Sequence, residues 1–287
     1  MSRFDTISFL SDYGTADEFV GVVHSVVRQL APHVTVVDVT HEVPPHEVRA
    51  GGLTLARSAQ YLVPGVVLAV VDPGVGTARR AVAVEVGHGE SVLVGPDNGL
   101  LAPAVAMVGG ATRAVELTND EYHLGAPGPT FAGRDIFAPV AAQICNGVAL
   151  GDLGPEVDPA GLTPGMIPIT RVDDDALVAE VLWTDRFGNL QLNVDPDEIA
   201  TFGDRIELRF DNRVRTGIRH DTYGEVKSGE IGLVVDSYGL VSMAIDQDSA
   251  ADELGIGTGD EVILAPLGDD DRPTSGTVSP VTLGRRS

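Results

Sequence analysis

The spacing of apolar residues changes repeatedly along the first half of the chain. Short continuous apolar runs are typical of strands, and apolar residues three and four apart are typical of helices. Strands are predicted over 6–11, 34–40 and 65–74, and helices over 16–32, 47–62 and 133–147. The segments AVAVEVG and SVLVGPDNG predict an antiparallel hairpin. Alternation of strands and helices predicts an α/β N-terminal domain, a layered sheet with helices, over residues 1–152.

The second half has a different pattern. Residues 153–170 are rich in Pro and Gly with little periodicity, which predicts a linker. Short β-type runs fill residues 171–268, among them ALVAEVLWTD, RIELRF and DEVILAPL. They predict an all-β C-terminal domain, a small barrel or sandwich. The polar residues 269–287 predict a flexible tail.

Composition narrows the class of partner. The 287 residues carry a net charge of −23, which would repel nucleic acid and anionic membrane surfaces. The one cysteine, Cys145, falls in an apolar helical pattern and reads as a core residue. The chain shows no signal peptide and no apolar run of membrane-spanning length, so we expect a cytoplasmic protein.

Acidic residues follow several predicted strands. Asp12, Asp17 and Asp72 are expected on one rim, because ligands collect at the carboxyl ends of parallel strands. Turn formation and helix capping explain Asp12 and Asp17 equally well. Asp72 is more unusual, since AVVDPGVGTARR places Arg79 seven residues after it. Turn chemistry accounts for the Pro and Gly residues between them but not for this acid–base pair.

Several common motifs are missing. No Gly-x-Gly-x-x-Gly follows the first strand and no Gly-x-x-x-x-Gly-Lys-Ser/Thr occurs, which argues against dinucleotide, nucleoside-triphosphate and methyltransferase sites. The histidines show no paired ligand spacing, so no metal centre is predicted. They stand at positions 24, 33, 41, 46, 88, 123 and 220.

Two further motifs have both a functional and a structural interpretation. PTFAGRDIF (129–137) opens a helix, where Asp135 complements the helix dipole, or else Thr130 and Phe131 line a pocket beside Asp72. In WTDRFGNLQLN (183–193), Phe187 could stack on a purine and Asn189 could read its edge. The same residues also make a good turn.

Six blocks, in order along nearly the whole chain, carry a resemblance to one family. They are FLSDYGTADEFVG, VVDPGVGT, GPDNGLL, PTFAGRDIFAP, TDRFGN and DSYGLVSMAI. The chain resembles the S-adenosyl-L-methionine (SAM) hydroxide adenosyltransferases, which hydrolyse SAM to adenosine and are related to the SAM-dependent fluorinase and chlorinase. The resemblance implies SAM as the substrate, no cofactor, and a homotrimer. Its sites would lie between the N-domain of one subunit and the C-domain of the next.

The resemblance also implies roles for individual residues. Asp12 would hold the ribose hydroxyls, Asp17 and Asp185 the methionine ammonium group, and Phe187 and Asn189 the adenine. The remaining residues would surround the adenine (Ser237, Tyr238, Ser242, Ile245) or the ribose and C5′ (Thr77, Thr130, Phe131, Gly133). Ser242 departs from the pattern, since hydrolases of the family often have Glu there.

The family's hydrolases use an Asp-Arg-His triad near the attacking water. Asp72 and Arg79 match its first two members, but Ala132 occupies the histidine position. Ala132 is either the natural residue or a His-to-Ala substitution that weakens turnover. The chlorinase has Tyr where this chain has Asp72 and lacks the arginine, so the resemblance implies a water nucleophile. A SAM- or adenosine-binding protein with little turnover is the alternative, and a halogenase is a weaker one.

Overall fold

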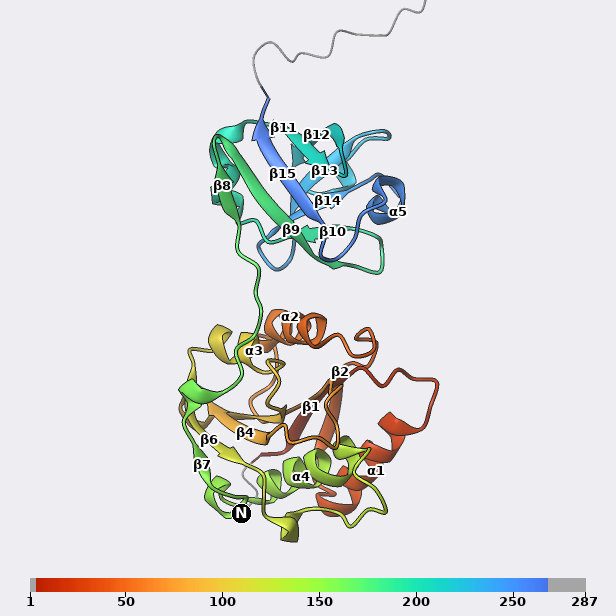
Figure 1. Cartoon of the computed structure of the whole chain (residues 1–287). Coiled ribbons are helices and arrows are strands. Elements are labelled where there is room, and N and C mark those ends of the chain that lie inside the picture. Colours follow the sequence, from red (N-terminus) through yellow and green to blue (C-terminus); the bar gives the residue numbers. More distant parts are fainter. Residues whose placement is uncertain (1–3, 268–287) are drawn as a thin grey trace, which may run out of the picture. The chain divides into compact units, whose positions relative to one another are not determined.

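The computed structural model describes residues 4–267, so the predicted tail over 269–287 lies outside the described residues. The chain divides into two compact units, one ending at Ile167 and the other beginning at Pro168 (Figure 1). Within the described residues, no helix is long and apolar enough to cross a membrane.

The N-terminal unit is built on a seven-stranded sheet with the order β2-β1-β3-β5-β4-β6-β7. Its strands are β1 (Thr6–Ser11), β2 (Thr35–Thr40), β3 (Val66–Val70), β4 (Ala81–Val86), β5 (Ser91–Pro96), β6 (Ala111–Glu116) and β7 (Glu156–Val157). Strands β2, β1, β3 and β5 run parallel, whereas β4 pairs antiparallel with β5, as the predicted hairpin requires. The last two strands were not predicted from the sequence.

Helices cover both faces of this sheet (Figure 1). They are α1 (Phe19–Leu30), α2 (Val48–Ala59), α3 (Ala102–Met107) and α4 (Ala138–Asn146), the last continuing a π-helical turn at Gly133–Phe137. Alternate residues of β3 point to opposite faces: Val66 and Leu68 join the core under α1 and α4, and Val67 and Ala69 join the core under α2 and α3. This two-faced burial explains why β3 is apolar throughout, and it confirms the α/β layered fold.

Cys145 lies in α4 and is fully buried. Burial raises the pKa of its thiol to about 12. The sequence-based interpretation of Cys145 as a core residue is confirmed, and the thiol is not a nucleophile at neutral pH.

The segment predicted as a linker, 153–170, differs in the structure. Glu156–Val157 pair with β6 as an edge strand, and Arg80 donates a hydrogen bond to the carbonyl of Gly161 at 2.7 Å. The boundary between the units falls between Ile167 and Pro168. Most of the segment therefore belongs to the N-terminal unit. The sequence did not predict this because backbone pairing requires no periodic apolar pattern.

The C-terminal unit is a closed β-barrel. Its strands are β8 (Arg171–Asp173), β9 (Ala176–Thr184), β10 (Leu190–Leu192), β11 (Arg205–Phe210), β12 (Arg213–His220), β13 (Ile231–Val235), β14 (Val241–Ala244) and β15 (Glu261–Pro266), with helix α5 at Ala250–Leu254. Strand β10 pairs with both β14 and β9, which closes a ring of seven strands, and β8 adds to β9 outside it. The predicted all-β domain is confirmed as a barrel.

Short 3₁₀ turns connect these elements. They span Gly87–Gly89, Asp120–Tyr122, Leu150–Asp152, Pro159–Gly161, Pro196–Phe202 and Tyr223–Glu225. The turn at Pro196–Phe202 begins with a capping box, in which Asp195 and Glu198 exchange side chain to backbone hydrogen bonds.

Candidate active site

Asp12 and Asp72 share the carboxyl edge of the first sheet. Strands β1 and β3 are parallel neighbours with Ser11 opposite Val70, so the residues that follow them leave the sheet side by side. The amide of Asp12 donates to the carbonyl of Val70 at 3.4 Å. One carboxylate oxygen of Asp12 accepts a hydrogen bond from the amide of His46 at 2.9 Å. The rim inferred from the sequence therefore holds these two acids.

Asp72 and Arg79 form a bidentate ion pair. Arg79 Nε donates to Asp72 Oδ1 at 2.8 Å, and Nη2 pairs with Oδ2. The two side chains are 6% and 14% exposed, and the guanidinium lies 5.2 Å from the ring centroid of Phe137. A fork-to-fork arrangement of this kind fixes both groups in space. The pairing of Asp72 with Arg79 across the turn is thus real, and Asp72 is held in one orientation.

The loop that joins the pair is held at both ends. Thr77 Oγ1 donates to the carbonyl of Gly74 at 2.7 Å, and Asn98, from the GPDNGLL block, donates to the carbonyl of Val71 at 2.9 Å. Gly76 has φ of +76°, and a Cβ there would lie 2.9 Å from the carbonyl oxygen of Pro129. The loop after β3 therefore packs directly on the segment that carries Thr130.

Tyr13 is the residue near this pair that sequence reasoning missed. Burial raises the pKa of its phenol well above the ordinary value, and Asp12 and Asp72 raise it further while Arg79 lowers it. A methyl group on Gly133 would come within 2.1 Å of the Tyr13 hydroxyl. The phenol is consequently a protonated donor beside the acids of the rim. Its position directly after Asp12, in SDYG, was the available signal.

The segment 130–135 brings aromatic and apolar groups to the same region. The ring of Phe131 meets that of Tyr13 edge-on at 5.5 Å between centroids, and Ala132 is buried in the core. Thr130 is exposed, and its amide donates to the carbonyl of Gly128 at 3.0 Å. Asp135 is buried and pairs with Arg134 at 2.6 Å. Ala132 brings no polar group of its own to the rim.

Asp17 stands apart from the other predicted acids. It is exposed in the bend before α1, and the structure gives its carboxylate no hydrogen bond or ion pair with another described residue. The structure therefore does not bring Asp17 into contact with the other acids of the rim, and it shows no capping or turn hydrogen bond for the Asp17 side chain with the described residues.

The predicted residues of the second unit gather around one pocket of about 860 Å³. It is lined by Asp185, Phe187, Asn189, Ser237, Tyr238, Ser242 and Ile245, with others. These residues come from two chain segments some fifty positions apart, which the barrel brings together because β10 pairs with β14.

Two loops of matching construction form the mouth of this pocket. In each, an aspartate begins a four-residue turn: Asp185 before Phe187, and Asp236 before Tyr238. Its Oδ1 accepts the amides two and four residues ahead, at 2.8 and 2.9 Å in the first loop and 2.8 and 3.2 Å in the second. The aromatic side chains are left 79% and 39% exposed. The turn interpretation of TDRFGN is thus correct, and the turn presents an aromatic face suited to stacking.

The floor of the pocket is polar and partly buried. Gln191, which is 2% exposed, donates to Asp236 at 2.5 Å, and its Oε1 has no hydrogen-bond partner within residues 4–267. Burial raises the pKa of the Tyr223 phenol, although the nearby Ser242 hydroxyl lowers it. Asn189 donates its side-chain amide to Asp185 at 2.8 Å. Gln191 lies within WTDRFGNLQLN, but nothing in that stretch distinguished it from an ordinary strand residue, and Tyr223 belongs to none of the motifs singled out in the sequence.

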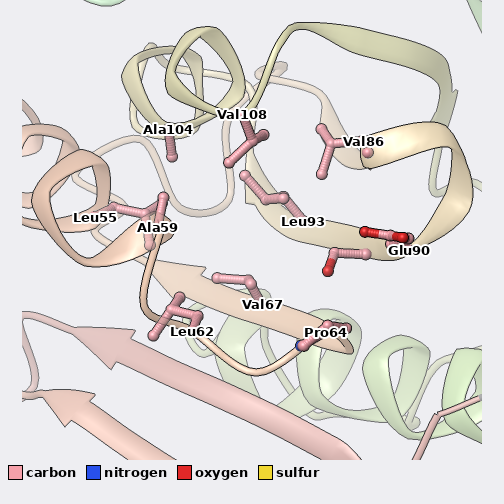
Figure 2. Close-up of a pocket in the computed structure, with 12 residues that line it drawn as sticks. Leu55, Ala59, Leu62, Pro64, Val67, Val86, Glu90, Leu93, Ala104 and Val108 are labelled. Atoms are coloured by element: carbon pink, nitrogen blue, oxygen red, sulfur yellow. The ribbon is translucent and has the colours of Figure 1, made fainter.

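A separate pocket of the N-terminal unit lies among α2, α3 and the hairpin β4–β5 (Figure 2). Its lining is largely aliphatic, including Leu55, Val67 and Leu93, with Glu90 as its charged member. None of the predicted site residues lines it. It has about 220 Å³ of space and no convergent polar groups for catalysis, so it is not the candidate site.

Comparison with known proteins adds independent information. The SAM hydroxide adenosyltransferase N-terminal domain model matches residues 7–154, and the C-terminal domain model matches residues 179–263. The chain is 48% identical to the (R)-S-adenosyl-L-methionine hydrolase of Salinispora tropica, over 89% of this chain and 96% of that protein. It is 37% identical to the enzyme of that name from Thermus thermophilus, over 90% and 98%. A fluorinase from Actinopolyspora mzabensis is more distant, at 26% identity over 85% and 92%.

A solved structure supports the same relationship. An uncharacterized conserved protein from Thermotoga maritima superposes with a TM-score of 0.83 and 31% identity, covering 90% of this chain and 99% of that one. The α/β sheet and the barrel correspond to the two domain models, so the chain has the two-domain architecture of that family. The chain belongs to the SAM hydroxide adenosyltransferase family.

Proposed function

We propose that this protein hydrolyses S-adenosyl-L-methionine to adenosine and L-methionine. The observation that carries the proposal is the buried, bidentate Asp72–Arg79 pair at the carboxyl edge of the parallel sheet. It occurs in a chain that is 37% and 48% identical to proteins named as hydrolases of this substrate. Those relatives are named for the (R) sulfonium epimer, so we propose that epimer as the preferred substrate.

The reaction is an in-line displacement at C5′ of the ribose. The oxygen of a water molecule forms a bond to C5′ while the C5′–sulfur bond breaks. The bonding electrons return to sulfur, which leaves as the neutral thioether of methionine, and the attacking water loses one proton, which is released to the solvent. Because the sulfonium is already a good leaving group, the protein has to orient the water and exclude bulk solvent. No cofactor is needed for these steps.

In this proposal the rim residues act on the water and the sugar. Asp72, fixed by Arg79, accepts a hydrogen bond from the attacking water, and the protonated Tyr13 phenol stands beside it as a donor. Asp12 binds the ribose hydroxyls, and Thr77, Thr130, Phe131 and Gly133 surround C5′. Asp17 binds the ammonium group of methionine.

The barrel pocket binds the base. Phe187 and Tyr238 offer exposed aromatic faces, and stacking of this kind supplies much of the affinity for a nucleobase. Asn189, Ser237, Ser242 and Ile245 complete the adenine contacts. The carboxylate of Asp185 already accepts hydrogen bonds from two loop amides and from the side chain of Asn189. Asp185 therefore has a structural role in the loop in addition to its proposed contact with the methionine ammonium group.

The family resemblance also leads us to propose a homotrimer. Each site would combine the rim of one subunit with the barrel pocket of the next. A cytoplasmic location remains a prediction from the sequence.

Ala132 motivates the second candidate function, a SAM- or adenosine-binding protein with little turnover. The methyl group of Ala132 is buried and cannot accept or orient a proton. The pocket residues and the rim would still bind ligand. This candidate differs from the first only in the rate of the chemical step, so product formation separates them.

A halogenase is the third candidate, because the chain is also related to a fluorinase. A bare carboxylate at the nucleophile site would repel a halide. Asp72 is paired with Arg79, which compensates much of its charge, so repulsion alone is a weak argument. Incubation with and without chloride distinguishes water from halide as the nucleophile.

The decisive experiment incubates the purified full-length protein with each sulfonium epimer of SAM, with and without chloride, beside Ala132→His. We expect adenosine and methionine in equal amounts, formed faster from the (R) epimer and faster still by Ala132→His. If both proteins bind SAM but neither forms adenosine, the hydrolase proposal fails and the binding protein remains. Chloride-dependent 5′-chloro-adenosine would identify a halogenase.

A further inference from the structure

Two histidines and an aspartate from separate elements meet on the first unit. His24 lies on α1, Asp38 on the edge strand β2, and His41 directly after that strand. Nε2 of His24 lies 2.8 Å from Oδ1 of Asp38, and Nε2 of His41 lies 3.0 Å from the same oxygen. One potential ligand atom from each of the three residues falls within 4.8 Å of the others.

His41 is held in a fixed orientation. Its side chain is 5% exposed, and its ring packs against Phe9 at 4.6 Å between centroids. Nδ1 lies 2.8 Å from the hydroxyl of Ser11, in a buried contact. In the tautomer with the proton on Nδ1, that N–H donates a hydrogen bond to the serine oxygen and Nε2 is unprotonated, which is the form of imidazole that binds a metal.

Among the residues that the structure describes, the buried Nε2 of His41 has no hydrogen-bond partner. Oδ1 of Asp38 lies 3.0 Å from this nitrogen, close enough for electrostatic attraction. A buried ring nitrogen without a partner is costly. Coordination of a cation between the two residues would satisfy it.

We propose that His24, Asp38 and His41 form a binding site for a divalent late first-row transition metal such as Zn²⁺. Two neutral imidazoles and one carboxylate form a ligand set that binds such ions in preference to Mg²⁺ or Ca²⁺, which favour all-oxygen ligands. Ser11 contacts the opposite ring nitrogen of His41 and so orients the imidazole, as hydrogen-bond partners of metal-binding histidines do. Asp38 and His24 are partly exposed, which leaves room for a solvent molecule as a fourth ligand.

The site would tie α1 to the end of β2 close to the catalytic rim. The carbonyl of His41 accepts the amide of Gly14 at 2.7 Å, and Ser11 immediately precedes Asp12. The metal is therefore placed as a structural clamp under the loops that carry Asp12 and Tyr13. The proposed hydrolysis does not pass through it, and this inference stands whether or not that proposal holds.

The sequence did not reveal the site because its ligands lack a local pattern. His24 and His41 are separated by seventeen positions and by a helix-to-strand connection. Only the packing of α1 over the β1–β2 edge brings them together, and the ring of Phe9 packs against both imidazoles. The expectation of no metal centre rested on spacing alone.

The test is a titration of the tag-free, chelator-treated full-length protein with Zn²⁺, and with Co²⁺ for its absorption spectrum. The partly exposed ligands are changed conservatively, as His24→Gln and Asp38→Asn, so that folding is preserved. His33→Gln is the matched control, because His33 is an exposed histidine in the same α1–β2 connection. Ser11→Ala probes the support of His41 without removing a ligand.

We expect saturable binding of one Zn²⁺ per chain, a rise in melting temperature, and no response to Mg²⁺. Ser11→Ala should weaken Zn²⁺ binding by about 10–100-fold, and each ligand variant by more, with loss of the Co²⁺ spectrum. His33→Gln should bind like the unmodified protein. Absence of binding in the unmodified protein, retention of binding in both ligand variants, or equal loss in His33→Gln would overturn the proposal.

Discussion

At the scale of single residues, the Asp72–Arg79 ion pair is the feature of the first unit that matters most for the proposed reaction. A carboxylate this deeply buried would be unfavourable without its guanidinium partner, and both oxygens are engaged by it. The arrangement fixes the direction in which Asp72 can receive a further hydrogen bond. That constraint is what a group orienting a small nucleophile requires.

Asp72→Asn should lower kcat by about 10²–10⁴-fold with a much smaller change in the affinity for adenosine. The amide retains the shape but loses one acceptor oxygen and the charge. Thermal unfolding followed by circular dichroism must accompany the rates, because breaking a buried ion pair also destabilises the fold.

The matched control for this change is Asp97→Asn. Asp97 forms an ion pair with Arg80, the residue after Arg79, with Nε to Oδ2 at 2.8 Å, and it is not part of the rim. We expect Asp97→Asn to lose stability and keep its kcat. A folded Asp72→Asn enzyme with unchanged kcat would contradict the assigned role.

The sequence exposed some residues of the site and concealed others for identifiable reasons. Asp72 and Arg79 were recognisable because no turn requires that pair. Tyr13 was overlooked because an aromatic residue after a strand commonly serves only to fill the core. Its closeness to Gly133 and to the acids of the rim, which marks it as a site residue, is visible only in the folded structure. Gln191 and Tyr223 depend on barrel closure, which residue patterns do not encode.

At the scale of elements, the two matched aspartate turns decide how the pocket is presented. Gly188 and Gly239 occupy the same position in their turns, with φ of +82° and +83°. They differ in surroundings, because a Cβ on Gly188 would lie 2.6 Å from the Cα of Ser249, whereas Gly239 has open space. The first loop is thereby wedged against the start of α5.

Gly188→Ala should therefore destabilise the protein more than Gly239→Ala. Both variants carry the left-handed backbone cost of about 1–2 kcal/mol, but only Gly188→Ala also forces the loop away from Ser249. Denaturant unfolding measures the difference, and calorimetry with adenosine should show weaker binding for Gly188→Ala alone. Equal effects of the two substitutions would mean that the contact with Ser249 does not hold the loop.

Elements were predicted well where periodicity was strong and poorly where pairing alone defines them. Strand β3 and helix α1 were predicted from the sequence because their apolar residues are buried in the cores that cover the sheet, which gives each a clear apolar pattern. Strand β7, two residues long, was absorbed into the predicted linker because it is defined by hydrogen bonds to β6 and not by its composition.

At the scale of the whole molecule, the proposed sites require more than one chain. Light scattering should give the mass of a trimer. Co-expression of Asp72→Asn chains with Phe187→Ala chains then tests where the sites lie, because each variant damages a different unit. If rim and pocket come from neighbouring subunits and the two chains assemble at random in equal amounts, the co-expressed population should recover about a quarter of the unmodified activity, since about one site in four then receives both intact halves.

Recovery should be absent when either variant is expressed alone. Mixed trimers with no more activity than the sum of the single variants would place rim and pocket in the same subunit. A monomer by light scattering would remove the basis for the trimer proposal altogether.

The burial of Cys145 has a practical consequence for such work. Because the chain has no other cysteine and this thiol has a pKa of about 12, thiol-directed dyes have essentially no native target in the folded protein. A cysteine introduced on an exposed loop of either unit would be labelled selectively without first removing the natural one. Pairs of such labels, one on each unit, would report by energy transfer in solution whether the distance between the labels changes when substrate is added.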